Sequence, residues 1–133
     1  MRSLRSLVLV GTIVALGAFA PLASASTDKP FHAVKVCANF TCVITSSSYR
    51  GTPAGTVINY TPNLDGTLTS VITVATGTAT GTCDLSSLPS SPGSCVFAAG
   101  TGSLTQLHMN LAVNTADGIT WTWDGTYTFG SGS

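Results

Sequence analysis

Two histidines and five aspartates are the side chains with which this sequence could build acid–base chemistry. The histidines are His32 and His108, and glutamate is absent. A hydrolase of the Ser-His-Asp type needs an imidazole that is oriented by a carboxylate and contacts a serine. The chain has no G-x-S-x-G nucleophile elbow, because the segment 100–104 lacks the closing glycine. We therefore predict no catalytic residues, and we keep as an alternative a hydrolase or isomerase that uses His108 with an aspartate.

The aspartates are better explained as turn residues. Asp65, Asp117 and Asp124 each precede a glycine, and an aspartate in that position commonly accepts hydrogen bonds from nearby backbone amides. The sequence contains neither a calcium-binding loop nor the cysteine and histidine spacing of a zinc site. We predict no metal site and no cofactor.

Two tryptophans share one face of a predicted strand. Trp121 and Trp123 alternate with Thr120, Thr122 and Asp124, which are typical of positions that face water. The tryptophan face is therefore predicted to be the buried one, and stacking on a sugar ring is the less favoured use of it. A small barrel can also enclose one apolar ligand. The side chains that would line such a cavity are Met109, Leu111, Trp121, Trp123 and Tyr127.

The four cysteines of this short chain predict two disulfides. Three pairings are possible. We favour Cys37 with Cys42 and Cys83 with Cys95, because the members of each pair are close in sequence and enclose residues typical of turns.

The first 25 residues have the pattern of a secretory signal peptide. Arg2 and Arg5 are followed by the apolar stretch 7–19 and by Ala23-Ser24-Ala25, an A-x-A cleavage site. The apolar stretch is shorter than the about 20 residues of a membrane-spanning helix. We predict that residues 26–133 form one secreted domain with no membrane span, in the periplasm if the host has an outer membrane. The short basic start and alanine-rich end indicate a bacterial host.

The charge of the predicted mature chain disfavours nucleic acid as a partner. Two lysines and one arginine stand against five aspartates, which gives a net charge of −2, and no basic run occurs. Binding to a phosphate backbone requires clustered cations. Threonine dominates the polar positions, and this β-branched residue favours strands over helices.

Alternation of apolar and polar residues predicts about eight strands. The clearest candidates cover 31–36, 41–45, 56–61, 67–75 and 107–113, with a further strand from 119 to 129. The threonine-rich segment 77–82 has the pattern of an edge or bent strand, the serine- and proline-rich segment 85–93 that of a surface loop, and strand signal resumes at Val96. Short turns leave no room for crossover helices, so we expect an all-β antiparallel fold. We favour a barrel over a two-sheet sandwich, because closure leaves no exposed strand edge.

Two segments carry a resemblance to known proteins. Phe97-Ala98-Ala99-Gly100-Thr101-Gly102-Ser103-Leu104 and Trp123-Asp124-Gly125-Thr126-Tyr127-Thr128-Phe129 together resemble the closing strands of small secreted actinobacterial proteins of uncharacterised function. The Gly-Thr-Gly turn is also similar to one in dirigent and allene oxide cyclase-like β-barrels. The resemblance covers about a third of the chain and implies an eight-stranded barrel. No catalytic residue of those plant proteins can be placed on this sequence.

The sequence has a complete pattern of strands and disulfides and no catalytic pattern, which favours a non-enzymatic role. We expect a disulfide-stabilised exported domain that binds a partner through the loops at one end of the barrel. That partner is either another extracellular protein or, in a lipocalin-like alternative, a small apolar ligand.

Overall fold

Eight strands account for most of the residues that the computed structural model describes, which are residues 28–130. The predicted signal peptide lies outside these described residues. The strands are β3 (Lys29–Ala38), β4 (Thr41–Ser47), β5 (Val57–Pro62), β6 (Leu68–Val74), β7 (Gly77–Asp84), β8 (Gly93–Gly102), β9 (Leu107–Thr115) and β10 (Thr120–Phe129). Within residues 28–130, no helix is long and apolar enough to cross a membrane.

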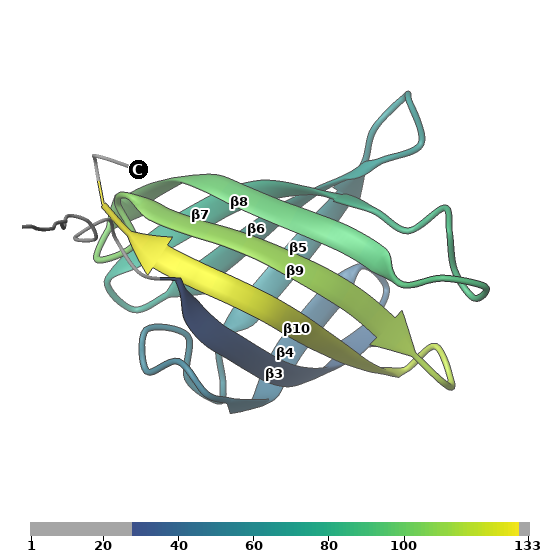
Figure 1. The fold of residues 1–133 in the computed structure, drawn as a ribbon, viewed down its shortest axis with the longest axis horizontal. Helices are drawn as coiled ribbons and strands as arrows, with labels where there is room; N and C mark the ends of the chain where they lie inside the picture. The colour runs from purple at the N-terminus through teal and green to yellow at the C-terminus, as the bar shows by residue number, and fades with distance from the viewer. Residues whose placement is uncertain (1–27, 131–133) are drawn as a thin grey trace, which may run out of the picture.

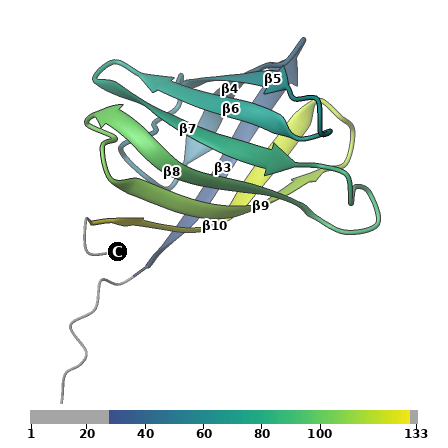
Figure 2. The ribbon, with the colours of Figure 1, turned by 90° about the horizontal axis from the view of Figure 1, so that it is seen from above.

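Each strand is antiparallel to the next one in the chain, and the last strand returns to the first. The order around the closed barrel is β10-β3-β4-β5-β6-β7-β8-β9 (Figures 1 and 2). This confirms the predicted eight-stranded antiparallel barrel and excludes the sandwich. The segment 77–82, expected at an edge or bend, belongs to β7, which pairs with β6 on one side and β8 on the other.

The middle of the barrel is filled with side chains. Trp123 is fully buried and meets Phe97 edge to face, with ring centroids 5.5 Å apart. The residues around them come from the inward-facing positions of most strands, as the period of two requires. They include Ala33, Ile44, Ile58, Ile72, Ala79, Met109 and Leu111.

A glycine makes room for this packing on β10. Trp121, Trp123, Gly125 and Tyr127 share one face of the strand, but a Cβ on Gly125 would lie 1.9 Å from the backbone oxygen of Asn110. The neighbouring strand β9 can therefore approach closely only where the side chain is missing.

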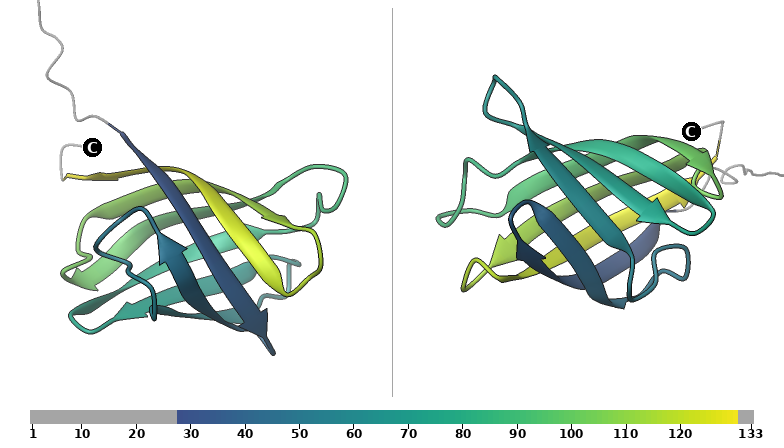
Figure 3. Two further views of the ribbon diagram at one scale, coloured as in Figure 1. Left: turned by 90° about the horizontal axis from the view of Figure 1, so that it is seen from below. Right: turned by 180° about the vertical axis from the view of Figure 1, so that it is seen from behind.

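The two ends of the described chain lie at one end of the barrel (Figure 3). An aromatic cluster occupies this end. Tyr49, from the loop between β4 and β5, packs on Tyr127 with ring centroids 4.3 Å apart. Phe31 and Phe129 extend the cluster. Because aromatic rings occupy this end of the barrel, an opening into the interior can form at the opposite end.

Two disulfides lie toward that opposite end, which also carries the loops that follow β3, β5, β7 and β9 (Figure 1). Cys37 pairs with Cys42 across β3 and β4, and Cys83 pairs with Cys95 across β7 and β8. Both predicted pairings are confirmed. Each bond joins residues directly opposite each other on neighbouring strands.

Replacing the central tryptophan should destabilise the barrel strongly. We expect Trp123→Ala to lower the free energy of unfolding by about 3 to 5 kcal/mol, because it removes a large buried ring and leaves a cavity. Chemical denaturation of the oxidised protein measures the change. Val43→Ala, on the exposed face of β4, is the matched control and should change stability little. A loss for Trp123→Ala no larger than that of the control would show that the ring is not part of the core.

Candidate functional site

A cavity of about 230 Å³ lies at the end of the barrel opposite the aromatic cluster. It exceeds the roughly 150 Å³ of an engineered apolar cavity that binds benzene, and is smaller than the about 300 Å³ at which typical ligand pockets begin. Its walls come from six strands (β3, β4, β5, β6, β9 and β10) and the adjoining loops. The lining residues are Lys35, Cys37, Ala38, Asn39, Phe40, Cys42, Tyr60, Leu68, Leu85, Val113, Gly118 and Trp121.

The β3–β4 hairpin forms one side of the mouth and is unusually built. Its two turn residues, Asn39 and Phe40, have φ angles of 52° and 64°. Two-residue hairpin turns of type I′ require this left-handed conformation at both positions, and glycine normally supplies it at the second. Phe40 nevertheless occupies that position, and the residue is 57% exposed and borders the cavity. The turn is held by the Phe40 carbonyl, which accepts a 2.8 Å hydrogen bond from Tyr60 N.

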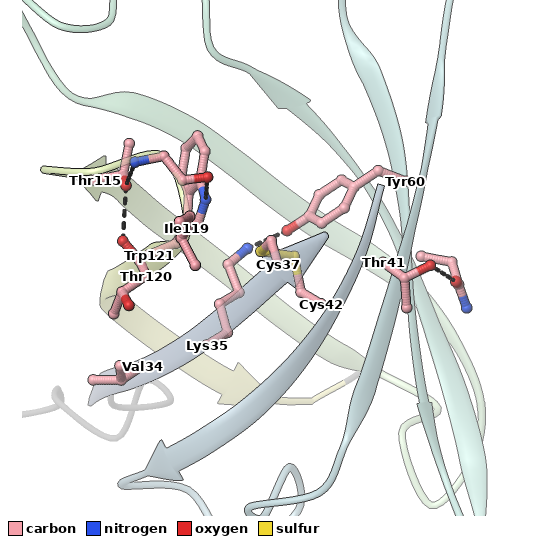
Figure 4. Close-up of a disulfide and its surroundings, with 12 residues drawn as sticks. Val34, Lys35, Cys37, Thr41, Cys42, Tyr60, Thr115, Ile119, Thr120 and Trp121 are labelled. Atoms are coloured by element: carbon pink, nitrogen blue, oxygen red, sulfur yellow. Dashed lines mark hydrogen bonds between the residues drawn. A yellow bond between two sulfur atoms is a disulfide. The ribbon is translucent and has the colours of Figure 1, made fainter. Parts of the chain in front are cut away.

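Lys35 supplies a buried amine to the cavity. It faces inward from β3 and is only 2% exposed. Its Nζ lies 3.8 Å from the centre of a Trp123 ring and donates a hydrogen bond to the hydroxyl of Tyr60 (Figure 4). Lys35 pairs with Trp121 across β3 and β10, so the cavity wall and the amine are fixed by the same strand pairing.

Burial changes the protonation of both polar groups. It lowers the pKa of Lys35 from 10.5 to about 6, because a charged ammonium would lose its hydration among apolar neighbours. Burial likewise raises the pKa of Tyr60, and the nearby Ser70 hydroxyl offsets part of the rise. At neutral pH the site therefore presents an uncharged amine beside a protonated phenol.

The ligand-binding residues predicted from the sequence do not share one cavity. Trp121 lines the mouth, whereas Trp123 and Met109 are fully buried in the filled middle. Tyr127 lies in the aromatic cluster at the closed end. The interior is thus filled around Trp123 and hollow around Trp121.

The candidate acid–base residues lie away from the cavity. His108 is at an outward position of β9, between the fully buried Leu107 and Met109, and it is not among the residues that line the cavity. The imidazole that does meet a carboxylate is that of His32, paired with Asp124 on the barrel exterior, where both side chains are half exposed. This position offers no enclosed space for a substrate.

The aspartates of the loops serve the turns. The Asp65 carboxylate accepts hydrogen bonds from the backbone N and the hydroxyl of Thr67, and these bonds lower its pKa. The Asp117 carboxylate accepts bonds from the backbone N of Ile119 and of Thr120, which lower its pKa in the same way. No cluster of residues suited to hold a metal ion occurs within 28–130.

Sequence reasoning missed Lys35, Tyr60 and Phe40. A signal for Lys35 was present, because it shares the parity of Phe31, Ala33 and Cys37 and so interrupts an otherwise apolar face. Counting it among the surface charges hid this position. Phe40 carried no comparable signal, because only the turn geometry places this residue at the mouth.

A scan against protein-family models, a search of curated proteins and a search of solved structures found no match. The geometry of the mouth cavity therefore carries the functional argument.

Replacing Lys35 with an apolar side chain should stabilise the protein in a pH-dependent way. The folded state binds fewer protons at Lys35 than the unfolded state between about pH 6 and pH 10, so this residue makes stability rise by about 1.4 kcal/mol per pH unit there. After allowance for the lost bond to Tyr60, we expect Lys35→Met to be about 3 kcal/mol more stable than the parent at pH 7. The difference should shrink toward pH 9.

Denaturation curves at pH 6, 7, 8 and 9 measure this difference. Lys29→Met removes the other lysine of the chain, an exposed one, and serves as the control that should show little dependence on pH. A stability difference for Lys35→Met that stays constant from pH 6 to pH 9 would contradict a neutral buried amine.

Proposed function

We propose that the mature protein is a non-enzymatic carrier that binds a small, mainly apolar ligand in the mouth cavity. The observation that carries the proposal is the hollow at Trp121, Leu68 and Leu85 in a barrel whose middle and opposite end are filled. Large side chains fill the core elsewhere in the barrel, so side chains of the same size could fill this end as well. Concave sites with apolar walls and few polar groups are typical of small-molecule binding.

The proposal gives a specific role to the loops at the open end. Asn39, Phe40, Leu85 and Gly118 belong to three of these loops and form the rim of the cavity. The two roles expected from the sequence, binding through the loops and carriage of an apolar ligand, are thus one function. The two disulfides brace strand ends at this rim and suit a site that works outside the cytoplasm. We further propose that residues 1–25 direct the chain there.

A small aromatic probe tests carriage directly. We expect indole, titrated into the ¹⁵N-labelled protein, to shift the amide resonances of Cys37, Leu85 and Trp121, and to leave those of the aromatic cluster at the closed end unchanged. Leu68→Trp fills the cavity and should weaken indole binding by about tenfold, since about 1.4 kcal/mol of lost contact is enough. Val43→Trp places the same ring on the exposed face of β4 and should leave binding unchanged.

Shifts scattered over the exterior, or equal binding by the two tryptophan variants, would refute carriage in this cavity. Native mass spectrometry of protein purified from its own host provides the complementary measurement, because a carrier should retain a bound mass that the Leu68→Trp variant lacks.

Phe40 should matter for binding and not for stability. Phe40→Gly removes the ring from the cavity rim and relieves the left-handed strain, which costs a non-glycine residue about 1 to 2 kcal/mol. The added freedom of glycine in the unfolded chain offsets about 0.5 to 1 kcal/mol of that relief. We expect the free energy of unfolding to change by about 1 kcal/mol or less, while indole binding weakens. Unchanged indole affinity in a well-folded Phe40→Gly protein would show that the ring is not part of the site.

A further inference from the structure

Lys35 places a buried amine at the wall of the mouth cavity. Its nitrogen lies over a ring of Trp123. Figure 4 shows its other neighbours, the hydroxyl of Tyr60 and the disulfide of Cys37 with Cys42. A lysine with so little exposed surface is ordinarily paired with a carboxylate. The contacts of this one are with an aromatic face and a phenol.

No carboxylate of the described residues reaches this amine. Asp28, Asp65 and Asp117 are exposed residues outside the strands, Asp84 is exposed at the end of β7, and Asp124 is paired with His32 on the outside of the barrel. The phenol of Tyr60 is thus the one titratable group within 28–130 that the structure shows in contact with Nζ. Lys35 is thus buried without a carboxylate partner and lines a cavity, and an ionisable group placed in this way is a candidate for a functional position.

Two kinds of ligand would complement a lone amine here. A carboxylic acid would give an ammonium its missing counter-charge, but both charges would have to leave water for walls that are mainly apolar. A carbonyl compound places no charge in the cavity and needs an amine with a free electron pair. Burial already lowers the pKa of Lys35 to about 6, so that this form dominates at pH 7. The structure therefore favours the carbonyl compound.

We propose that Lys35 captures the aldehyde or ketone group of a small apolar ligand as a Schiff base. The proposal rests on the proposed carriage function, because the apolar part of the ligand would occupy the same cavity. Lys35 Nζ attacks the carbonyl carbon with its electron pair, and the carbonyl oxygen takes up a proton to give a carbinolamine. Loss of the two amine hydrogens and the oxygen as one water then forms the C=N bond. No oxidant or reductant takes part.

Tyr60 is placed to move the proton in this step. Its hydroxyl is hydrogen-bonded to the attacking nitrogen. Because burial keeps the phenol protonated, it can donate a proton to the carbonyl oxygen and recover one from the nitrogen. A proton donor held at the nucleophile is the arrangement that carbinolamine formation and dehydration require.

Reductive trapping with benzaldehyde and sodium cyanoborohydride at pH 7 tests the proposal. We expect peptide mapping to find on Lys35 the mass of the aldehyde less one oxygen atom. Lys29 is the internal control, because an exposed lysine is protonated at this pH and must lose its proton before it can attack. Lys35 should be modified about tenfold faster than Lys29, since its larger unprotonated fraction outweighs its lower basicity.

Variants of Lys35 and Tyr60, and competition with indole, distinguish capture in the cavity from the general reactivity of lysine side chains with aldehydes. Lys35→Met should abolish the fast adduct while Lys29 continues to react, and Tyr60→Phe should slow adduct formation at Lys35. Excess indole should protect Lys35. Trapping at Lys35 should also fall below about pH 6, where protonation removes the electron pair.

Three other outcomes overturn the proposal in distinguishable ways. If indole binds but Lys35 is modified no faster than Lys29, the Schiff base is wrong and carriage stands. If neither occurs, both proposals fail. If benzoate binds in a manner that depends on Lys35 and takes up a proton, while no benzaldehyde adduct forms, the cavity recognises an acid.

Discussion

The pairing of β10 with β3 is the constraint on which the rest of this structure depends. It joins the last strand of the chain to the first through eight residue pairs, from Thr120 with Val36 to Tyr127 with Lys29. Without it, a sequence with few charges would expose two long strand edges. The same register sets Trp121 opposite Lys35, so closing the barrel also builds the wall and the polar end of the mouth cavity.

The interior of the barrel is packed differently at its two ends. The aromatic cluster at one end and the Trp123–Phe97 contact in the middle fill their space. At the other end the chain keeps a hollow, a buried amine and a phenylalanine in a left-handed turn. Each of these three features lowers stability. The disulfide of Cys37 with Cys42 borders the cavity, that of Cys83 with Cys95 lies toward the same end of the barrel, and both restrict the unfolded chain and so stabilise the fold.

Much of the fold could be predicted because its signals are local. Alternation over 107–113 and 119–129 fixed which faces of β9 and β10 are buried, and the short cysteine separations favoured the pairings that formed. The site could not be predicted to the same extent. Alternation places Met109, Trp121, Trp123 and Tyr127 on inward faces and therefore predicts one shared cavity, but their different positions along the strands separate them into a core, a mouth and a closed end.

The sequence by itself determined that this chain forms antiparallel strands and that its cysteines pair within hairpins, because a period of two and short turns act between near neighbours. Only the tertiary structure decided that Lys35 faces Tyr60 and the ring of Trp123. These residues lie on three strands far apart in the chain, and their distances follow from the register and closure of the whole barrel. Lysine is a residue type that normally lies at the surface, and closure of the barrel buries the amine of Lys35.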